Sequence, residues 1–281
     1  MKTHHFYYLT LALILLGGGL LVTLFISETI FAKDLAENTE RIIVDPDLTT
    51  GGGQRDSFQA SHYADTTAYL KGIDISKYQK DIDWSGLSNK ITFIICKATE
   101  GRTLMDSEFD SNWKNIEKAG RYRGAYHFYR SNDDPEVQAE FFYSTVGELK
   151  ANDLPMVLDI ESGSLVGAIN KTKLTADLLS FLQTVEKLSG KKPMIYSNSY
   201  FASQYLNQEE FATYPLWVAE YTSKSEPTIP YFWTANSGWS FWQRSASYDL
   251  SSVDGEVDFD IFNGNMEALK NFISSTSEED Q

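Results

Sequence analysis

The sequence predicts an α/β fold, an irregular TIM-like β/α barrel with about eight strands and fewer than eight helices. Strand and helix patterns alternate from about residue 70 onward, which is typical of a parallel sheet. The strand candidates are about as many as a closed barrel needs. An open doubly wound sheet, the alternative, usually carries a glycine-rich phosphate loop, and the sequence contains no such motif.

The first half of the barrel is predicted from short apolar runs and the helices between them. Three strand candidates, one of them rich in β-branched residues, span 72–76, 91–97 and 123–129. Phe109, Trp113 and Ile116 recur at helical spacing between the second and the third. Asp134 and Pro135 then predict a helix start, with the aspartate as N-cap and the proline in the first turn.

The central strand candidate, 154–161, ends in two carboxylates, Asp159 and Glu161. Because side chains alternate faces along a strand, both should point the same way, roughly 7 Å apart. Two acids on one face raise the pKa of at least one of them. A carboxylic acid with a raised pKa beside an ionised carboxylate is what acid-catalysed glycoside cleavage requires. The competing interpretation is a strand that ends in solvent with two ordinary surface acids.

The second half continues the alternation with fewer helices. Leu174, Leu178, Leu182 and Val185 mark an amphipathic helix that Gly190 closes. The remaining candidates are strands at 193–197, 215–220, 239–243 and 256–261, a short helix at 199–206 and a terminal helix at 264–272.

Four segments are predicted along the chain: an N-terminal signal-anchor or signal peptide at 1–32, a flexible acidic and glycine-rich linker at 33–69, the barrel at 70–274 and an acidic tail at 275–281. The run 6–26 is apolar and uncharged, and roughly 20 such residues cross a bilayer as a helix. Lys2 before the run and Glu28 after it favour an internal N-terminus. We therefore expect a single-pass cell-membrane protein with the barrel outside; secretion after signal cleavage is the alternative.

Composition narrows the function classes. The formal charge of −15 and the pI near 4.7 argue against a nucleic-acid partner. The single cysteine, Cys96, lies in an apolar run, so no internal disulfide can form and a buried small side chain is expected. We expect a monomeric catalytic domain.

Acids and aromatic residues gather at the predicted strand ends, where barrels of this kind carry their sites. The acids are Asp74, Glu100, Asp159, Glu161 and Asp258, and the aromatic residues are Tyr78, Tyr126, Phe128, Tyr196, Trp217, Tyr221 and Trp242. Sugars present apolar faces for stacking and hydroxyls for carboxylates, so this combination predicts a carbohydrate cleft.

Short motifs at the same positions resemble those of the glycoside hydrolase family 25 muramidases, in the same order. They are Asp74-Ile75-Ser76-Lys77-Tyr78-Gln79, Lys97-Ala98-Thr99-Glu100-Gly101, Gly124-Ala125-Tyr126-His127-Phe128, Asp159-Ile160-Glu161, Leu216-Trp217-Val218-Ala219-Glu220-Tyr221, Trp242-Gln243 and Val257-Asp258. Each is weak alone, but seven in register are specific, and they cover about residues 71–273.

The resemblance implies a lysozyme that cleaves the β-1,4 bond between N-acetylmuramic acid and N-acetylglucosamine in peptidoglycan glycan strands. By the resemblance Glu161 is the general acid and Asp159 the carboxylate that stabilises the developing oxocarbenium ion. Asp74 and Asp258 orient the sugar or tune Glu161, and Glu100 is a secondary catalytic candidate. The aromatic residues line the sugar subsites, and no cofactor or metal is implied. His127, the one histidine of the predicted barrel, is expected to be a hydrogen-bonded wall residue rather than a metal ligand.

Two departures from the family pattern and two competing functions remain. Asp260 stands where the family often has an amide, and strand alternation places it on the same side as Asp258. No repeated wall-binding module is present, so tethering through 6–26 would supply local concentration instead. A non-catalytic glycan-binding or scaffold protein would be favoured by a missing acid, and none is missing. A chitinase-like enzyme would carry further acids at Leu154 and Val157.

Overall fold

The computed structural model describes residues 69–79 and 81–276. The strands are β1 Leu70–Ile75, β2 Ile91–Glu100, β3 Leu104–Met105, β4 Tyr122–Phe128, β5 Val157–Asp159, β6 Met194–Asn198, β7 Leu216–Ala219, β8 Phe241–Asp249 and β9 Glu256–Phe262. The helices are α3 Phe109–Lys118, α4 Pro135–Val146, α5 Lys171–Ser189, α6 Ser199–Tyr205, α7 Tyr231–Ala235 and α8 Met266–Ser275, with 3₁₀ turns η2 Ser162–Ser164 and η3 Phe211–Thr213.

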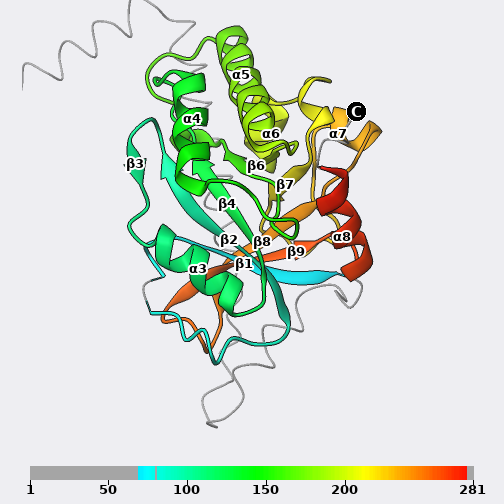
Figure 1. Cartoon of the computed structure of the whole chain (residues 1–281). Coiled ribbons are helices and arrows are strands. Elements are labelled where there is room, and N and C mark those ends of the chain that lie inside the picture. Colours follow the sequence, from blue (N-terminus) through cyan, green and yellow to red (C-terminus); the bar gives the residue numbers. More distant parts are fainter. Residues whose placement is uncertain (1–68, 80, 277–281) are drawn as a thin grey trace, which may run out of the picture. The chain divides into compact units, whose positions relative to one another are not determined.

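Eight of these strands form a closed ring in the order β1-β9-β8-β7-β6-β5-β4-β2, because β2 also pairs with β1; β3 extends the sheet beyond β2. Six α-helices accompany the ring in the described part of the chain, and Figure 1 shows α4 and α5 side by side. The predicted irregular α/β barrel, with fewer helices than strands, is therefore confirmed.

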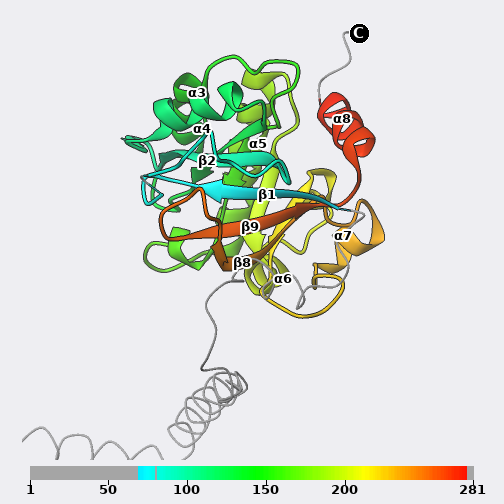
Figure 2. The same ribbon diagram turned by 90° about the horizontal axis from the view of Figure 1, so that it is seen from below.

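Strand direction departs from the expected parallel sheet at β9. From β1 through β2 and β4 to β8 neighbouring strands pair in parallel, whereas β9 is antiparallel to both β8 and β1. Only residues 250–255 separate β8 from β9, which is too few for a crossover helix, so the two strands form a hairpin. Figure 2 shows β1, β9 and β8 side by side. Asp258, in the first half of β9, consequently lies opposite Asp74 in β1.

The predicted helix ends are confirmed where the sequence carried a capping residue. The Asp134 carboxylate accepts hydrogen bonds from the backbone N–H groups of Glu136 and Val137 at 3.0 and 3.1 Å, and Pro135 opens α4. Gly190 closes α5 with φ of 64°, a left-handed conformation that glycine adopts without steric cost. The terminal helix, α8, runs past the predicted end and stops at Ser275.

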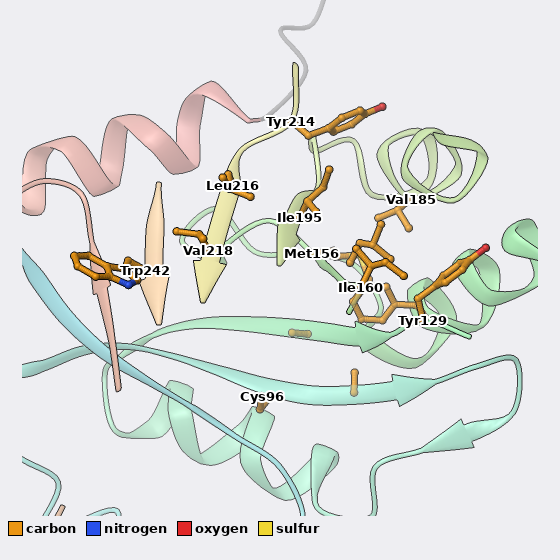
Figure 3. Close-up of a cluster of buried hydrophobic side chains, with 14 of the residues drawn as sticks. Cys96, Tyr129, Met156, Ile160, Val185, Ile195, Tyr214, Leu216, Val218 and Trp242 are labelled. Atoms are coloured by element: carbon orange, nitrogen blue, oxygen red, sulfur yellow. The ribbon is translucent and has the colours of Figure 1, made fainter. Parts of the chain in front are cut away.

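Alternation along the strands divides the core into two layers. Residues such as Phe93, Val157, Met194 and Trp217 belong to an inner cluster within the ring, which Leu269 of α8 joins. Their strand neighbours belong to an outer cluster between the ring and the helices; Figure 3 shows part of it, with Met156, Ile160, Ile195, Leu216, Val218 and Val185 among the labelled side chains. Cys96 is buried in the outer cluster, as expected, and burial raises the pKa of its thiol.

The apolar run 6–26, predicted to cross a membrane, and residues 33–68 of the predicted linker lie outside the described residues. Within 69–79 and 81–276, none of the helices has the length and apolar character that a membrane span requires.

Candidate active site

A cleft of about 390 Å³ opens where β1, β2 and β4–β7 end at their carboxyl termini. Its lining includes Asp74, Asp159, Glu161, Asp258, Tyr78, Tyr126, Phe128, Tyr196, Trp217 and Tyr221, all of which the sequence pointed to. Lys97, Gln79 and Gln243 also line it and were not among the predicted site residues.

Asp159 and Glu161 face this cleft together. Asp159 is the last residue of β5, which is shorter than the predicted strand, and Glu161 keeps an extended backbone with φ −149° and ψ −174°. The alternation therefore continues past the strand and leaves Ile160, between the two acids, in the outer core. Glu161 is also the N-cap of the 3₁₀ turn η2, where its backbone N–H donates to Ser164 Oγ at 3.1 Å.

Burial sets the protonation of this pair. It raises the pKa of Asp159 well above its usual range, and the nearby Glu161 carboxylate raises it further. Oδ1 of Asp159 has no hydrogen-bond partner within the described part of the chain. Burial also raises the pKa of Glu161, while the Lys97 ammonium opposes that shift. Burial, and not a neighbouring carboxylate, is therefore the principal cause of the raised pKa of Glu161.

Asp74, Asp258 and Asp260 form a second group of acids in the floor of the barrel. Asp74 Oδ2 accepts a 2.7 Å hydrogen bond from Gln243 Nε2, and Asp260 Oδ1 accepts one of 2.9 Å from Trp217 Nε1. Burial, reinforced by the neighbouring carboxylates, raises the pKa of Asp74 and of Asp260 well above the usual range. Burial also raises the pKa of Asp258 to about 6. Val257, Phe259 and Ile261 of β9 belong to the outer cluster, so Asp258 and Asp260 share the inward face, as expected.

Gln243 links the acids to the aromatic wall. Its Oε1 accepts hydrogen bonds from the hydroxyls of Tyr196 and Tyr221 at 2.9 and 2.7 Å, while its Nε2 donates to Asp74. The amide therefore fixes two tyrosines and one carboxylate at once. Gln243 belongs to the Trp242-Gln243 motif but was not among the predicted site residues. The local signal for it was alternation, which puts one of these two neighbours on the inner face of the strand.

The aromatic residues divide into accessible walls and a buried floor. Tyr78 and Tyr221 are 76% and 59% exposed, so their ring faces are open to a ligand. Trp217 lines the cleft but is only 1% exposed, which makes it a floor residue rather than a stacking surface.

The prediction that Trp242 lines the sugar subsites is wrong. Its side chain is fully buried in the outer core, and its Nε1 donates to the Glu220 carbonyl at 2.8 Å (Figure 3). Since Gln243 faces the cleft, its neighbour on β8 must face the opposite side.

Glu100 lies beside the cleft and is engaged by two cations. Lys97 Nζ binds its Oε2 at 2.7 Å, and Arg130 Nη2 binds its Oε1 at 2.5 Å. Burial opposes ionisation of Glu100, but the hydrogen bonds from Lys97 and Arg130 outweigh burial and lower its pKa. A carboxylate held ionised in this way is a poor proton donor, so its place as a secondary catalytic candidate is not supported by its surroundings.

His127 is hydrogen-bonded, as expected, but it is not part of the cleft wall. Its Nδ1 lies 2.7 Å from Thr99 Oγ1 and its Nε2 3.2 Å from Gln138 Oε1, and its ring stacks on Phe181 of α5. Burial lowers its pKa to about 3, so the ring stays neutral. Across the residues that the structure describes, no group of three or more His, Cys, Asp or Glu is arranged to hold a metal ion.

The cleft thus combines an acid with a raised pKa, a buried carboxylate beside it and exposed aromatic faces. This set can protonate a leaving oxygen, stabilise a developing cation and hold a sugar ring.

Comparison with known proteins places the chain among glycosidases. Residues 73–253 match the model of glycosyl hydrolases family 25. Lysozyme M1 of Streptomyces globisporus is 33% identical over 223 residues, which cover 76% of this chain and 74% of that protein. The uncharacterized protein YegX of Escherichia coli K12 is 36% identical over 217 residues, covering 74% and 75%. A crystal structure of the bacterial lysozyme from Streptomyces coelicolor aligns with a TM-score of 0.69 at 33% identity, over 75% of this chain and 100% of that one.

Proposed function

The chain belongs to family 25 of the glycosyl hydrolases, and we propose that this glycoside hydrolase cleaves the β-1,4 bond between N-acetylmuramic acid and N-acetylglucosamine in peptidoglycan. The observation that carries the proposal is the convergence of Asp159, Glu161, Asp74 and Asp258 in one cleft with open tyrosine faces. The lysozymes among its relatives support the same substrate.

Glu161 acts as the general acid in this proposal. Its pKa is raised by burial, so the carboxyl group keeps its proton at a pH where an ordinary surface glutamate has lost it. It also lines the cleft and is less buried than Asp159, so its carboxyl group is the more accessible of the two to a glycosidic oxygen. Protonation of that oxygen lets the bond to the anomeric carbon break.

Asp159 serves the other half of the reaction. It is the buried last residue of β5, two residues before Glu161, and its Oδ1 accepts no hydrogen bond from the described residues. As positive charge develops on the sugar ring, that oxygen can stabilise it, and the cation in turn favours the ionised form of Asp159. As the bond breaks, the proton of Glu161 passes to the leaving oxygen, and the ionised form of Asp159 stabilises the positive charge on the sugar ring.

Asp74, Asp258 and the tyrosines position the sugar. Gln243 holds Asp74 and the hydroxyls of Tyr196 and Tyr221 in one network, so the floor and one wall keep fixed orientations. Tyr78 and Tyr221 offer ring faces to the apolar sides of the sugars. Such preorganised contacts reduce the entropic cost of placing the bond over Glu161.

Replacement of Glu161 by glutamine tests the role of the acid. Glu161→Gln keeps the shape and hydrogen-bonding capacity of the side chain but carries no transferable proton. We expect turnover of purified peptidoglycan, followed as release of soluble glycan, to fall at least about 1,000-fold, while binding to the insoluble glycan changes less than about threefold. The matched control is Glu256→Gln, an exposed acid at the start of β9. Comparable turnover by wild type and Glu161→Gln would remove Glu161 as the acid.

We also propose that the run 6–26 anchors the protein in the cell membrane with the barrel outside. The length and uncharged character of that run support an anchor. Fractionation of cells that produce the full chain should recover it with membranes and leave the barrel open to added protease. Recovery of a shortened chain from the medium would instead establish the secreted alternative.

A further inference from the structure

Glu100 and Arg130 form an ion pair at the edge of the cleft that the catalytic proposal does not use. Arg130 donates to Glu100 Oε1 from both Nε and Nη2, at 3.1 and 2.5 Å, which leaves its Nη1 directed elsewhere. Lys97 occupies the other oxygen of Glu100. The carboxylate thus joins the end of β2 to the segment that follows β4.

The remaining nitrogen of Arg130 reaches the turn that carries Glu161. Nη1 donates to the Gly163 carbonyl at 2.6 Å, in the middle of η2. Beside it, the Ser131 N–H donates to the Ser164 carbonyl at 2.9 Å, and Ser131 Oγ accepts from the Val166 N–H at 2.8 Å. Residues 130–131 therefore make two hydrogen bonds to the 162–164 turn and a third to Val166, just after it.

The turn in turn fixes Glu161. The Ser164 N–H donates to the Glu161 carbonyl at 3.0 Å, and side chains of both residues complete a capping box. A Cβ placed on Gly163 would lie 3.3 Å from Phe128 Cζ and 3.4 Å from Glu161 Oε1, so the turn packs directly against both side chains. The guanidinium carbon of Arg130 lies 4.8 Å from the centre of the Phe128 ring, on the same assembly.

We propose that Glu100 and Arg130 are positioning residues: Glu100 orients the Arg130 guanidinium, which holds the 162–164 turn and thereby aims the Glu161 carboxyl into the cleft. This inference rests on the proposed role of Glu161. It gives Glu100 a function in the reaction that needs no proton transfer and no contact with the substrate.

A double-mutant cycle tests whether the two residues act as one unit. We expect Arg130→Met and Glu100→Gln each to lower kcat by about 30- to 100-fold, because small displacements of a catalytic group are costly, with KM changed less than about threefold. The double variant should be no slower than the slower single variant. Arg102→Met is the matched control, since Arg102 pairs with Asp133 at 3.5 Å on an exposed part of the surface; its kcat should stay within about twofold.

Two kinetic results would overturn the proposal. One is an Arg130→Met protein whose kcat stays within about threefold of wild type. The other is additive losses in the double variant, which would mean that Glu100 acts without Arg130. Should Arg130→Met fail to fold, Arg130→Lys replaces it: lysine keeps the charge but cannot bind Glu100 and Gly163 together, so the same loss of kcat is expected.

Hydrogen exchange of the full-length chain provides a measurement that does not depend on turnover. In Arg130→Met the amides of residues 162–166 should exchange at least about tenfold faster, with exchange in α5 unchanged. If exchange in the turn is unchanged in Arg130→Met, Arg130 does not hold the turn, whether or not the protein is active. If the wild type does not hydrolyse peptidoglycan but Arg130→Met still shows the faster exchange, the result counts against the proposed hydrolase function alone.

Discussion

At the scale of single residues, the floor of the cleft holds three carboxyl groups that burial keeps from ionising freely. Asp74, Asp258 and Asp260 lie in adjacent strands, and the pKa of each is raised. Such groups favour the folded state when protonated and oppose it when charged. At neutral pH these three carboxyl groups therefore lower the stability of the folded chain, and the same raised pKa values let them hold protons in the site.

Asp258 allows this cost to be measured. Its folded-state pKa of about 6 lies above the ordinary value of 3.8, so its stabilising contribution is present at low pH and is lost as the pH rises through about 6. We expect Asp258→Asn to raise the free energy of unfolding at pH 7.5 by about 2 kcal/mol relative to its effect at pH 4.5. Thermal unfolding of both proteins at both pH values measures it.

The control for this comparison is Asp254→Asn, which removes a charge from an exposed position in the same hairpin. Its effect on the melting temperature should be small at either pH. An Asp258→Asn protein whose stability changes equally at pH 4.5 and 7.5 would show that Asp258 is not held in its neutral form by the fold.

Some site residues could be predicted because their signal is local, and others could not. Asp159 and Glu161 are two residues apart, so alternation alone places them on one face. Alternation shows that Trp242 and Gln243 face opposite sides of β8, but which of the two faces the cleft depends on how β8 pairs with β7. The Glu100–Arg130 pair was missed for a similar reason: it joins residues 30 positions apart whose approach depends on the β2–β4 register.

At the scale of the elements, β1 depends on a glycine that faces the ring interior. A Cβ on Gly72 would lie 2.2 Å from Cε2 of Phe93, whose fully buried ring packs edge-on against Phe241 with centroids 5.0 Å apart. Because the Phe93 ring is fully buried, a side chain at position 72 would have to displace it within the inner cluster.

We therefore expect Gly72→Ala to lower the free energy of unfolding by about 1–3 kcal/mol, from overpacking. Denaturant unfolding at the pH optimum of stability measures the change. Lys71→Ala, one position earlier and facing the other side of β1, should change stability by less than about 0.5 kcal/mol. Equal effects of the two substitutions would show that the interior at Gly72 has room to spare.

Elements were predictable where the sequence marked their ends. The caps of α4 and α5 carry Asp134, Pro135 and Gly190, whose conformational preferences act within one turn. The antiparallel direction of β9 follows from the brevity of residues 250–255, a signal that was present but was outweighed by the alternation before it. The two-residue strand β3 and the five-residue helix α7 are too short to show a periodicity.

At the scale of the whole barrel, the antiparallel β9 is what completes the site. In a parallel strand, the residues nearest the cleft would be those at the carboxyl end. Because β9 is antiparallel, the residues near its amino end reach the cleft instead, and Asp258 lies opposite Asp74. The ring closes on β1 through the same pairing. Closure of the barrel and assembly of the acidic floor are therefore one structural event.

The measurement that tests the account most directly is analysis of the reducing ends released from purified peptidoglycan by the full-length chain. Products are reduced with borohydride and identified by mass spectrometry. New reduced ends at N-acetylmuramic acid, absent with Glu161→Gln, are the predicted result. New ends at N-acetylglucosamine would contradict the bond assigned here, and tight glycan binding without any product would contradict a catalytic role for the cleft.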